Sequence, residues 1–327
     1  MVGKKTVSNS VVPAVCIICV YFGPFPACFK KWEESCGWNS DIDFLIVTDQ
    51  SYSSSFKNIK VLNKSLNELK KSIENIVAYQ VALNRPYKLC DFKPIYGSLF
   101  REYLEGYDYW GHCDMDMVFG DLRSFFREKE LSKYQRFLDL GHLSLYKNDE
   151  YMNCAYQLPV ENCLSAKDAF TSEESCAFDE VGMRNVCLQN GISLFDERIF
   201  ADISALYRRF RLALNDKNYK LQAFYVEDGK VFRAYWCDGT VCLNEYIYIH
   251  FKERNFTHSQ LLIDSGSPFY ITSSGFIEKK AGLPTSEELS KINPYPGILC
   301  EAIEKLGHSS IRRINNLACR AGIANKR

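Results

Sequence analysis

The sequence predicts an α/β protein in which a mixed sheet is flanked by helices and followed by a C-terminal helical extension. In the first half of the chain, short apolar runs alternate with helix-like stretches, a pattern typical of parallel strands joined by crossover helices. In the second half, two Asp-Gly turns between apolar runs predict antiparallel hairpins. We expect a main domain at residues 1–282, divided into halves at 1–125 and 126–282, and a helical tail at 283–327.

The composition is that of a folded protein with a sizeable core. The chain has 327 residues, of which 46% are hydrophobic. Lysine plus arginine number 40, as do aspartate plus glutamate, so the formal net charge is zero and no overall field favours nucleic acid. The longest apolar stretch, Val11 to Phe22, is broken by Pro13 and is shorter than the ~20 residues of a membrane-spanning helix. No small-residue cleavage site follows it, so we expect a cytoplasmic protein.

The fourteen cysteines are scattered from Cys16 to Cys319, without the dense spacing of a disulfide scaffold. This distribution indicates reduced thiols. Cys16 and Cys19 form a C-x-x-C pair within a β-branched run, where residues three apart point to opposite faces of a strand. Because no second pair lies nearby, buried thiols are favoured over a zinc or redox site.

The elements of the first half follow one another in a regular order. Strands are predicted at 11–21, 43–48, 59–62 and 107–113, and helices at 27–36, 65–81 and 93–104. The helix at 27–36 follows the Gly23-Pro24-Phe25-Pro26 turn. Ser65 and Glu68 have the spacing of a capping box, and the fixed φ of Pro94 suits the first turn of a helix.

The pattern is less regular in the second half. A strand is predicted at 142–146, a helix at 179–189, and a strand pair at 231–235 and 241–249. Turns of the pair are expected at Val226-Glu-Asp-Gly-Lys230 and Trp236-Cys-Asp-Gly-Thr240.

The tail from Leu283 ends in a helical pattern that combines apolar and basic residues. The apolar residues on one face are Ile311, Ile314, Leu317 and Ala318. The basic residues close by are Arg312, Arg313, Arg320, Lys326 and Arg327. Such a tail indicates attachment to anionic lipid at the inner face of the cell membrane. The alternative is a solvated terminal helix that packs on the body of the protein.

The strongest functional signal is Asp114-Met115-Asp116, which directly follows the strand at 107–113. In an open α/β sheet, ligands bind outside the carboxyl ends of the strands. If the chain stays extended here, both carboxylates project to the same side, where they can hold magnesium or manganese and leave positions for substrate phosphates. The bound metal would screen the charge on a departing diphosphate. The alternative is an aspartate pair that caps a helix or binds water.

Several motifs together resemble a bacterial capsule and O-antigen glycosyltransferase family of GT-A fold. They are Tyr21-Phe-Gly-Pro-Phe-Pro26, Tyr87-Lys-Leu-Cys-Asp-Phe-Lys-Pro-Ile-Tyr-Gly97, Gly106-Tyr-Asp-Tyr-Trp-Gly-His-Cys-Asp-Met-Asp-Met-Val-Phe-Gly-Asp121 and Gly141-His-Leu-Ser-Leu-Tyr-Lys-Asn148. The resemblance covers roughly the first 150 residues well and the remainder thinly. It implies a Rossmann-like mixed sheet of GT-A type in a catalytic domain at 1–282. The half at 1–125 would bind a nucleotide-sugar and the half at 126–282 the acceptor.

The resemblance also implies particular site residues. The residues implied to hold the donor are Tyr21, Phe22, Gly23, Thr48, Asp49, Lys88, Asp91, Asp114, Met115, His142 and Lys252. The implied metal ligands are Asp114, Asp116 and His250. Of the donor set, Tyr21 to Gly23, Thr48 and Asp49 fall where base and ribose bind. Lys88 and Asp91 match the basic-then-acidic pair that precedes the D-x-D motif. His250-Phe-Lys252 resembles a late H-F motif, although Glu253, Arg254 and Asn255 replace the glycine, lysine and tryptophan expected after it.

The chemistry of these residue types agrees with the implied roles and leaves alternatives. Imidazole is a common metal ligand, Lys252 supplies a point charge to phosphate, and Arg254 could bind phosphate bidentately. His250 could instead bond to backbone at the end of its strand. Lys88 could be solvated, and His142 could be a core histidine.

An inverting transferase needs a general base for the acceptor hydroxyl, and a carboxylate is the usual choice. Asp179 and Glu180 are our candidates because they open a predicted helix, and helix capping is their alternative role. Asp196, Glu197 and Asp202 are further candidates. A retaining mechanism needs no such base, so the stereochemistry stays open.

We therefore predict a glycosyltransferase, of the hexosyltransferase class, that uses a UDP-sugar and Mn²⁺ or Mg²⁺. The expected acceptor is a saccharide or a lipid-linked glycan in surface polysaccharide synthesis. One alternative is a metal-dependent nucleotidyltransferase or phosphohydrolase, although the sequence has neither a P-loop nor G-x-G-x-x-G. A second alternative is a non-catalytic glycan-binding module, because the many tyrosines and phenylalanines could stack on sugar faces.

Overall fold

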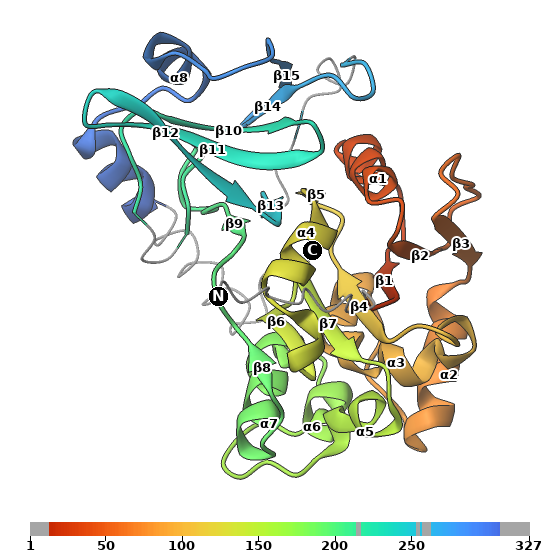
Figure 1. The fold of residues 1–327 in the computed structure, drawn as a ribbon. Helices are drawn as coiled ribbons and strands as arrows, with labels where there is room; N and C mark the ends of the chain where they lie inside the picture. Colours follow the sequence, from red (N-terminus) through yellow and green to blue (C-terminus); the bar gives the residue numbers. More distant parts are fainter. Residues whose placement is uncertain (1–12, 214–216, 253–255, 257–262, 308–327) are drawn as a thin grey trace, which may run out of the picture. The chain divides into compact units, whose positions relative to one another are not determined.

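The computed structural model describes residues 13–213, 217–252, 256 and 263–307 (Figure 1). The chain forms two compact units, each assembled from separate stretches of sequence. The first unit comprises Met1–Phe25, Cys36–Met115 and Leu122–Glu197, and the second comprises Pro26–Ser35, Asp116–Asp121 and Arg198–Arg327. The predicted halves at 1–125 and 126–282 do not coincide with these units, because residues 26–35 and 116–121 pack with the later part of the chain.

The described strands of the first unit form a mixed sheet in the order β3-β2-β1-β4-β7-β6-β8. Their bounds are β1 Val15–Val20, β2 Asp43–Thr48, β3 Ile59–Asn63, β4 Tyr109–Cys113, β6 Arg136–Leu140, β7 Leu143–Lys147 and β8 Leu194–Phe195. Strands β3, β2, β1 and β4 run parallel, and β7 is antiparallel to β4. Strands β1 and β2 are apolar at almost every position, as strands covered on both faces require. The predicted fold class, an α/β protein with a mixed sheet flanked by helices, is confirmed.

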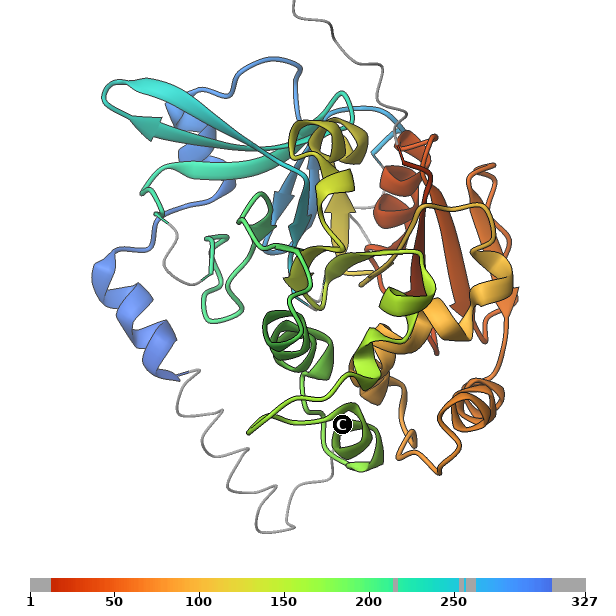
Figure 2. The ribbon, with the colours of Figure 1, turned by 60° about the horizontal axis from the view of Figure 1, so that its bottom comes forward.

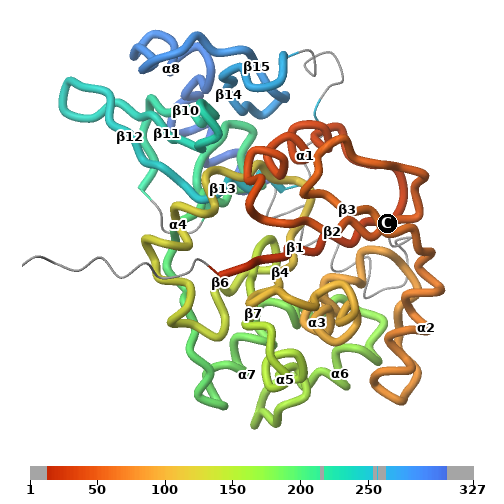
Figure 3. The backbone as a smooth tube through the Cα atoms, turned by 45° about the vertical axis from the view of Figure 1, so that its right-hand side comes forward, coloured from red at the N-terminus to blue at the C-terminus, as the bar shows by residue number. Residues whose placement is uncertain are grey.

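Helices cover one face of this sheet and share a continuous apolar core with it (Figure 3). Their bounds are α2 Leu66–Val77, α3 Tyr96–Leu99, α5 Glu150–Asn153, α6 Ala166–Thr171 and α7 Met183–Gln189. Within this core, Trp110 of β4 stacks on Tyr146 of β7 with ring centroids 4.5 Å apart. The helix α4, Leu122–Glu128, packs on β6 through an edge-to-face contact between Phe126 and Phe137.

The helices of the first unit confirm one local prediction and correct two. Ser65 and Glu68 form the predicted capping box of α2. The helix predicted at 93–104 is wrong: the chain forms a 3₁₀ segment at Pro86–Ile95, then α3, then a 3₁₀ turn at Arg101–Tyr103. Pro94 lies inside the first of these segments, and proline cannot donate a helical hydrogen bond. The helix predicted at 179–189 begins with a π-helical turn at Phe178–Gly182 and continues as α7.

The second unit contains an antiparallel sheet in the order β12-β11-β10-β14-β15, labelled in Figure 1. Its strands are drawn in teal to blue in Figure 2. Its strands are β10 Gln222–Glu227, β11 Lys230–Cys237, β12 Thr240–Tyr246, β14 Phe269–Thr272 and β15 Gly275–Glu278. Asp228 and Gly229, and likewise Asp238 and Gly239, all have positive φ between 50° and 81°, which matches the right-handed twist of a tight hairpin. Both predicted hairpins are therefore confirmed.

A smaller sheet of the second unit positions the residues considered below. It contains β5 Met117–Phe119, β13 Tyr248–His250 and β9 Ala201–Asp202, with β13 between the other two. The helix α1, Phe29–Trp38, begins in this unit and ends in the first. Near its middle, Ser35 Oγ accepts a hydrogen bond of 3.1 Å from the backbone N–H of Phe119.

The described chain beyond residue 283 contains two short helices separated by residues 293–297, and the predicted helical tail at 283–327 stays a prediction. The helix α8, Ser286–Ile292, begins with a capping box formed by Thr285 and Glu288, and a further helix spans residues 298–307. The predicted apolar face from Ile311 to Ala318 lies outside the described residues. The cysteines in the described part of the chain are free thiols, as predicted. Within the same residues, no helix has the length and apolar character needed to cross a membrane.

Candidate functional site

The predicted base- and ribose-binding residues meet where β1 and β2 end. Because these strands are parallel neighbours, the residues after them reach the same edge of the sheet. The backbone N–H of Gly23 donates to Asp49 Oδ1 at 2.9 Å, and Gly23 has a φ of +92° that a side chain would strain. Hydrogen bonds from the Gln50 amide and from Gly23 hold the pKa of Asp49 below its usual range.

The other predicted residues of this edge lie in the same two loops. Thr48 is buried, and its hydroxyl accepts a hydrogen bond of 3.2 Å from the backbone N–H of Gln50. Phe22 is buried as well, whereas Tyr21 lies beside the ring of Phe25 with centroids 6.1 Å apart. The structure thus gathers this group of residues in the first unit, and their contact with a nucleotide stays a prediction.

The D-x-D motif lies where the chain passes from the first unit to the second. Asp114 follows β4, and its backbone N–H donates to the carbonyl of His142 at 3.1 Å. The chain then bends at Met115 and Asp116 before it enters β5, so the extended conformation assumed from the sequence is wrong. Asp114 belongs to the first unit and Asp116 to the second, and Met115 between them is buried.

Lys93 links two of the predicted carboxylates in the first unit. Its Nζ lies 2.6 Å from Asp114 Oδ1 and 3.5 Å from Asp179 Oδ2, and it donates to the carbonyl of Gly141 at 2.8 Å. We call Lys93, Asp114 and Asp179 the Lys93 cluster. Burial alone would lower the pKa of Lys93, but the two carboxylates outweigh it and hold this pKa well above its usual value. Lys93 is therefore a permanent cation.

Asp179 has an unusual electrostatic position in this cluster. Burial raises its pKa to about 7, Lys93 opposes that rise, and the charges of Glu180 and Asp114 add to it. A carboxyl group with a pKa near the working pH can accept and release a proton efficiently. Asp179 and Glu180 lie in the first turn of the helical segment at 178–189, as the capping alternative has it, but the N-cap is Ala177 and no side chain forms a cap hydrogen bond there.

The loop between β6 and β7 contacts the π-helical turn that carries Asp179 and Glu180. Glu180 Oε1 accepts a hydrogen bond of 2.9 Å from the backbone N–H of Gly141, and a Cβ atom at Gly141 would overlap Asp179 Oδ2. Arg136, fully buried on β6, donates to the carbonyl of Asp179 at 2.8 Å. His142, the next residue in this loop, is buried, which is the core position left open as its alternative.

Lys88 and Asp91 form a buried ion pair 2.7 Å long in the first unit. The Lys88 ammonium also donates to the carbonyls of Ala169 and Glu174, at 2.8 and 2.5 Å. The Asp91 carboxylate accepts further hydrogen bonds from the backbone N–H groups of Cys176 and Phe178. Because both side chains are fully buried, the alternative of a solvated Lys88 is wrong. The pair ties the 3₁₀ segment to the chain at 169–178, and a role in holding a donor stays a prediction.

The second unit contains a group of charged and polar side chains, which we call the His250 cluster: Asp116, Asp202, His250 and Lys252. Strand register explains how they meet, because His250 of β13 is paired with Asp202 of β9 on one side and with Met117 of β5 on the other. His250 Nδ1 lies 3.0 Å from Asp202 Oδ1, and His250 Nε2 lies 3.4 Å from Asp116 Oδ1. The alternative of a histidine bonded only to backbone is therefore wrong.

Lys252 completes this cluster from the segment after β13. Its Nζ lies 2.9 Å from Asp202 Oδ2, and its backbone has a φ of +52°, which is rare outside glycine and recurs at functional sites. Burial would raise the pKa of Asp202, but the hydrogen bond from His250 and the charge of Lys252 hold it below its usual range. Asp202 is thus a poor proton acceptor. Arg254, considered for phosphate binding, lies outside the described residues.

The pairing of Asp116 with His250 fits a divalent cation. Metal-binding histidines usually direct their second ring nitrogen to a carboxylate, and Asp202 holds Nδ1 of His250 in this way. Two ligands about 2.1 Å from one ion and at right angles to each other lie about 3 Å apart. The 3.4 Å between Asp116 Oδ1 and His250 Nε2 is close to this spacing. Oxygen and imidazole ligands together suit manganese, and magnesium where carboxylates predominate.

The remaining candidates for a general base are surface groups of the first unit. Asp196 forms an ion pair of 2.8 Å with Arg184, and Glu197 lies 3.8 Å from Lys129. The two side chains are 45% and 65% exposed, and each is paired with a basic side chain at the surface.

Two solved structures are similar to this chain at low sequence identity. The apo form of mouse xyloside xylosyltransferase 1 is 7% identical, with 60% of this chain and 89% of that chain covered and a TM-score of 0.36. The S. aureus TarS 1-349 structure is 10% identical, with 57% of this chain and 58% of that chain covered and a TM-score of 0.31. These values are too low to carry either protein's activity over to this chain.

Sequence comparison gives a family without a known activity. No curated protein matches the chain. The model of DUF6625, a family of unknown function, matches residues 17–280, which is more than half of the sequence. This match includes both the Lys93 cluster and the His250 cluster, and the chain belongs to the DUF6625 family.

Proposed function

We propose that this protein is a glycosyltransferase that moves a sugar from a nucleotide-sugar to an acceptor hydroxyl with the help of a divalent cation. The observation that carries the proposal is the His250 cluster, in which a carboxylate-held imidazole lies beside the second aspartate of a D-x-D motif. The D-x-D motif follows a central strand of a Rossmann-like sheet, where ligands of such sheets bind.

In this proposal Asp116 and His250 hold Mn²⁺ or Mg²⁺, and Asp114 is the further ligand that the D-x-D pattern predicts. The cation, when bound, neutralises the charge that develops on the departing diphosphate. Asp202 keeps the ring of His250 oriented, and Lys252 adds a positive charge for a phosphate group. Asp202 thus positions His250, and Lys252 binds phosphate.

The edge of the sheet after β1 and β2 supports the nucleoside part of the proposal. Asp49, whose carboxylate is kept ionised by its hydrogen bonds, would accept hydrogen bonds from ribose hydroxyls. The nearby rings of Tyr21, Phe25 and Tyr52 would offer an aromatic surface to a base. We propose uridine as this base, following the resemblance of the N-terminal motifs.

Asp179 is the general base of the proposal. Its pKa of about 7 allows it to take the proton of an acceptor hydroxyl while the hydroxyl oxygen bonds to C1 of the sugar. At the same time the bond from C1 to the diphosphate breaks, which gives inversion at C1. Lys93 remains charged throughout and stabilises the ionised form of Asp179 between proton transfers. A saccharide or lipid-linked acceptor in surface polysaccharide synthesis is the proposed biological substrate.

The test is calorimetric titration of UDP with and without Mn²⁺. We expect the wild-type protein to bind UDP only when Mn²⁺ is supplied. We expect Asp116→Ala and His250→Ala to show no such increase in UDP binding when Mn²⁺ is added. Release of UDP from UDP-sugars should fall by about 10³-fold in Asp116→Ala, equivalent to ~4 kcal/mol of barrier.

Asp238→Asn, in the exposed hairpin turn between β11 and β12, is the matched control and should behave as wild type, since asparagine tolerates the positive φ of 50° there. Metal-independent UDP binding, or full activity of Asp116→Ala, would contradict the proposal. Binding of glycan without UDP would point to a glycan-binding module instead.

A further inference from the structure

The helix at residues 298–307 turns its apolar side chains to solvent. Ile298, Leu299, Ile303 and Leu306 are 77%, 73%, 60% and 68% exposed. At 100° per residue, these four positions and Ala302 fall within an arc of about 140° on the helix surface. An apolar stripe of this width is the face that a surface helix normally buries against a core.

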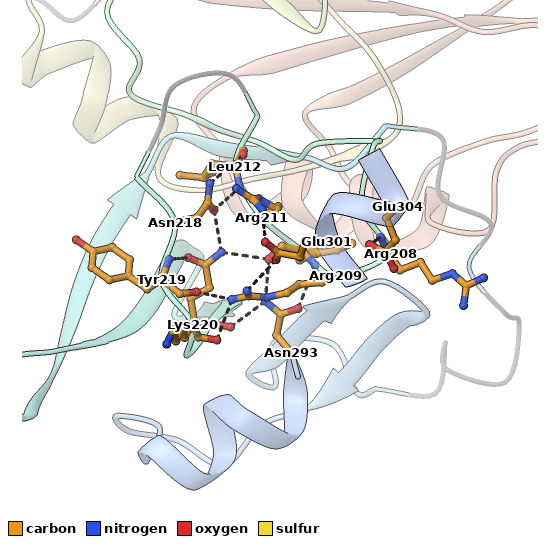
Figure 4. A network of polar contacts seen from close by, with 12 residues as sticks. Arg208, Arg209, Arg211, Leu212, Asn218, Tyr219, Lys220, Asn293, Glu301 and Glu304 are labelled. Carbon is orange, nitrogen blue, oxygen red and sulfur yellow. Dashed lines mark hydrogen bonds and ion pairs between the residues drawn. The ribbon is translucent and has the colours of Figure 1, made fainter. Parts of the chain in front are cut away.

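The opposite, acidic face of this helix contacts residues 208–211 of the same unit (Figure 4). Glu301 is only 14% exposed and accepts from Arg209 at 3.2 Å and from Arg211 at 2.6 Å. The backbone N–H of Arg208 donates to Glu304 Oε2 at 3.3 Å. The helix is therefore held by its acidic side, with its apolar stripe directed away from these contacts.

The two arginines are themselves fixed by the surrounding chain. Arg209 donates to the carbonyls of Tyr219 and Lys220 (Figure 4). It also lies over the ring of Tyr295, 5.0 Å from its centroid. Asn293, just before the helix, bonds to the carbonyls of Phe210 and Gln222. Turning the apolar stripe inward would break the Glu301 ion pairs and leave a buried arginine charge uncompensated. The outward orientation is thus the stable one.

The residues next in sequence carry only positive charge. Residues 308–327 contain Arg312, Arg313, Arg320, Lys326 and Arg327 and no aspartate or glutamate. An apolar helix face followed at once by a basic segment is complementary to a membrane with anionic headgroups.

We propose that the helix at 298–307 lies in the interface of an anionic lipid bilayer, with Ile298, Leu299, Ile303 and Leu306 among the acyl chains. The ion pairs of Glu301 hold the rest of the second unit to this helix, so the whole unit lies at the membrane surface. The inference goes beyond sugar transfer and does not depend on it, because it rests on exposure, anchoring contacts and charge alone.

The test is co-sedimentation of the full chain with lipid vesicles. We expect binding to vesicles of phosphatidylglycerol and phosphatidylethanolamine, and much weaker binding to pure phosphatidylcholine. Added salt should weaken the binding, since charges are screened within about 8–10 Å at physiological ionic strength. The double variant Leu299→Glu, Ile303→Glu should lose at least about tenfold in vesicle affinity, since it removes apolar area and adds repelled charge.

Leu188→Glu is the matched control, because Leu188 on α7 is likewise 62% exposed and lies outside the helix. It should bind vesicles as the wild type does, and both variants should unfold at the wild-type temperature. Failure of the wild type to bind anionic vesicles would overturn the proposal, as would wild-type binding by the double variant. A double variant that changes the mass in solution without changing vesicle binding would assign the face to a second copy. Metal-dependent UDP binding, measured on the same samples, reports separately on the proposed function.

Discussion

The Lys93 cluster and the His250 cluster each combine two carboxylates with nitrogen-containing side chains, but in different ways. In the Lys93 cluster, a buried and permanently charged ammonium lies between Asp114 and Asp179. In the His250 cluster, Asp202 holds one nitrogen of an imidazole, and the other nitrogen lies near Asp116. The first arrangement neutralises carboxylates and leaves one of them, Asp179, with a pKa of about 7. The second keeps a carboxylate and an imidazole available to a cation. The two clusters therefore place their carboxylates beside different partners, an ammonium in one and an imidazole in the other.

Removing the base from the Lys93 cluster should have the largest effect on stability. Lys93→Met removes the countercharge of Asp114, which is 33% exposed, and of Asp179, which is buried, and breaking a buried pair such as Lys93–Asp179 costs about 3–5 kcal/mol. Urea unfolding at pH 8, where both carboxylates are ionised in the unfolded chain, measures this loss.

Lys252→Met in the His250 cluster is the matched control. Lys252 is 35% exposed, and the loss of its ion pair with Asp202 should cost at most about 1 kcal/mol. Equal losses in the two variants would mean that the two clusters do not differ in the way described.

The orientation of His250 by Asp202 should matter next. Asp202→Asn keeps the size of the side chain but removes the charge that holds Nδ1 and stabilises the ring. Losing such a partner typically lowers metal affinity about 10–100-fold. Titration with Mn²⁺, followed by calorimetry on the protein alone, measures the change without requiring turnover.

Asp196→Asn, which alters an exposed ion pair with Arg184, should leave Mn²⁺ affinity unchanged. An unchanged affinity in Asp202→Asn would show that His250 needs no partner to bind metal, or that it binds none.

Local patterns predicted the parts of the molecule that depend on neighbours in sequence. The strand at 43–48, the Ser65 capping box and both Asp-Gly hairpins are found where the sequence placed them. In each case the deciding interactions lie within a few residues. The D-x-D motif was recognised because it directly follows a strand, although the bend at Met115 and Asp116 was missed.

Contacts between distant residues could not be predicted in this way. Lys93 meets carboxylates 21 and 86 residues away and was read only as part of a helix. Its signal was its place just before Pro94, which cannot continue a regular helix and favours the turn that buries the lysine. Asp202 was considered only as a base, because nothing in its own segment indicates that it pairs with His250, 48 residues later. The division into two units likewise follows from the pairing of β5 with β13.

The last expected effect, and a small one over any single pH unit, is the dependence of stability on pH that Asp179 creates. Burial raises its pKa in the folded protein to about 7, above its ordinary value of 3.8, so between these values the folded state binds a proton that the unfolded state has released. Asp179 therefore contributes stability at acidic pH, and this contribution is lost as pH rises from about 4 to about 7, by at most about 1.4 kcal/mol per pH unit. Asp179→Asn should remove this slope in urea unfolding measured from pH 5 to pH 8, whereas Asp196→Asn, at an exposed ion pair, should retain it.

Asp179→Asn should also lose the rise in sugar transfer near pH 7 that a general base of this pKa produces. If the slope disappears but the pH profile of transfer stays as in wild type, Asp179 is a buried acid held by Lys93 and another group takes the acceptor proton.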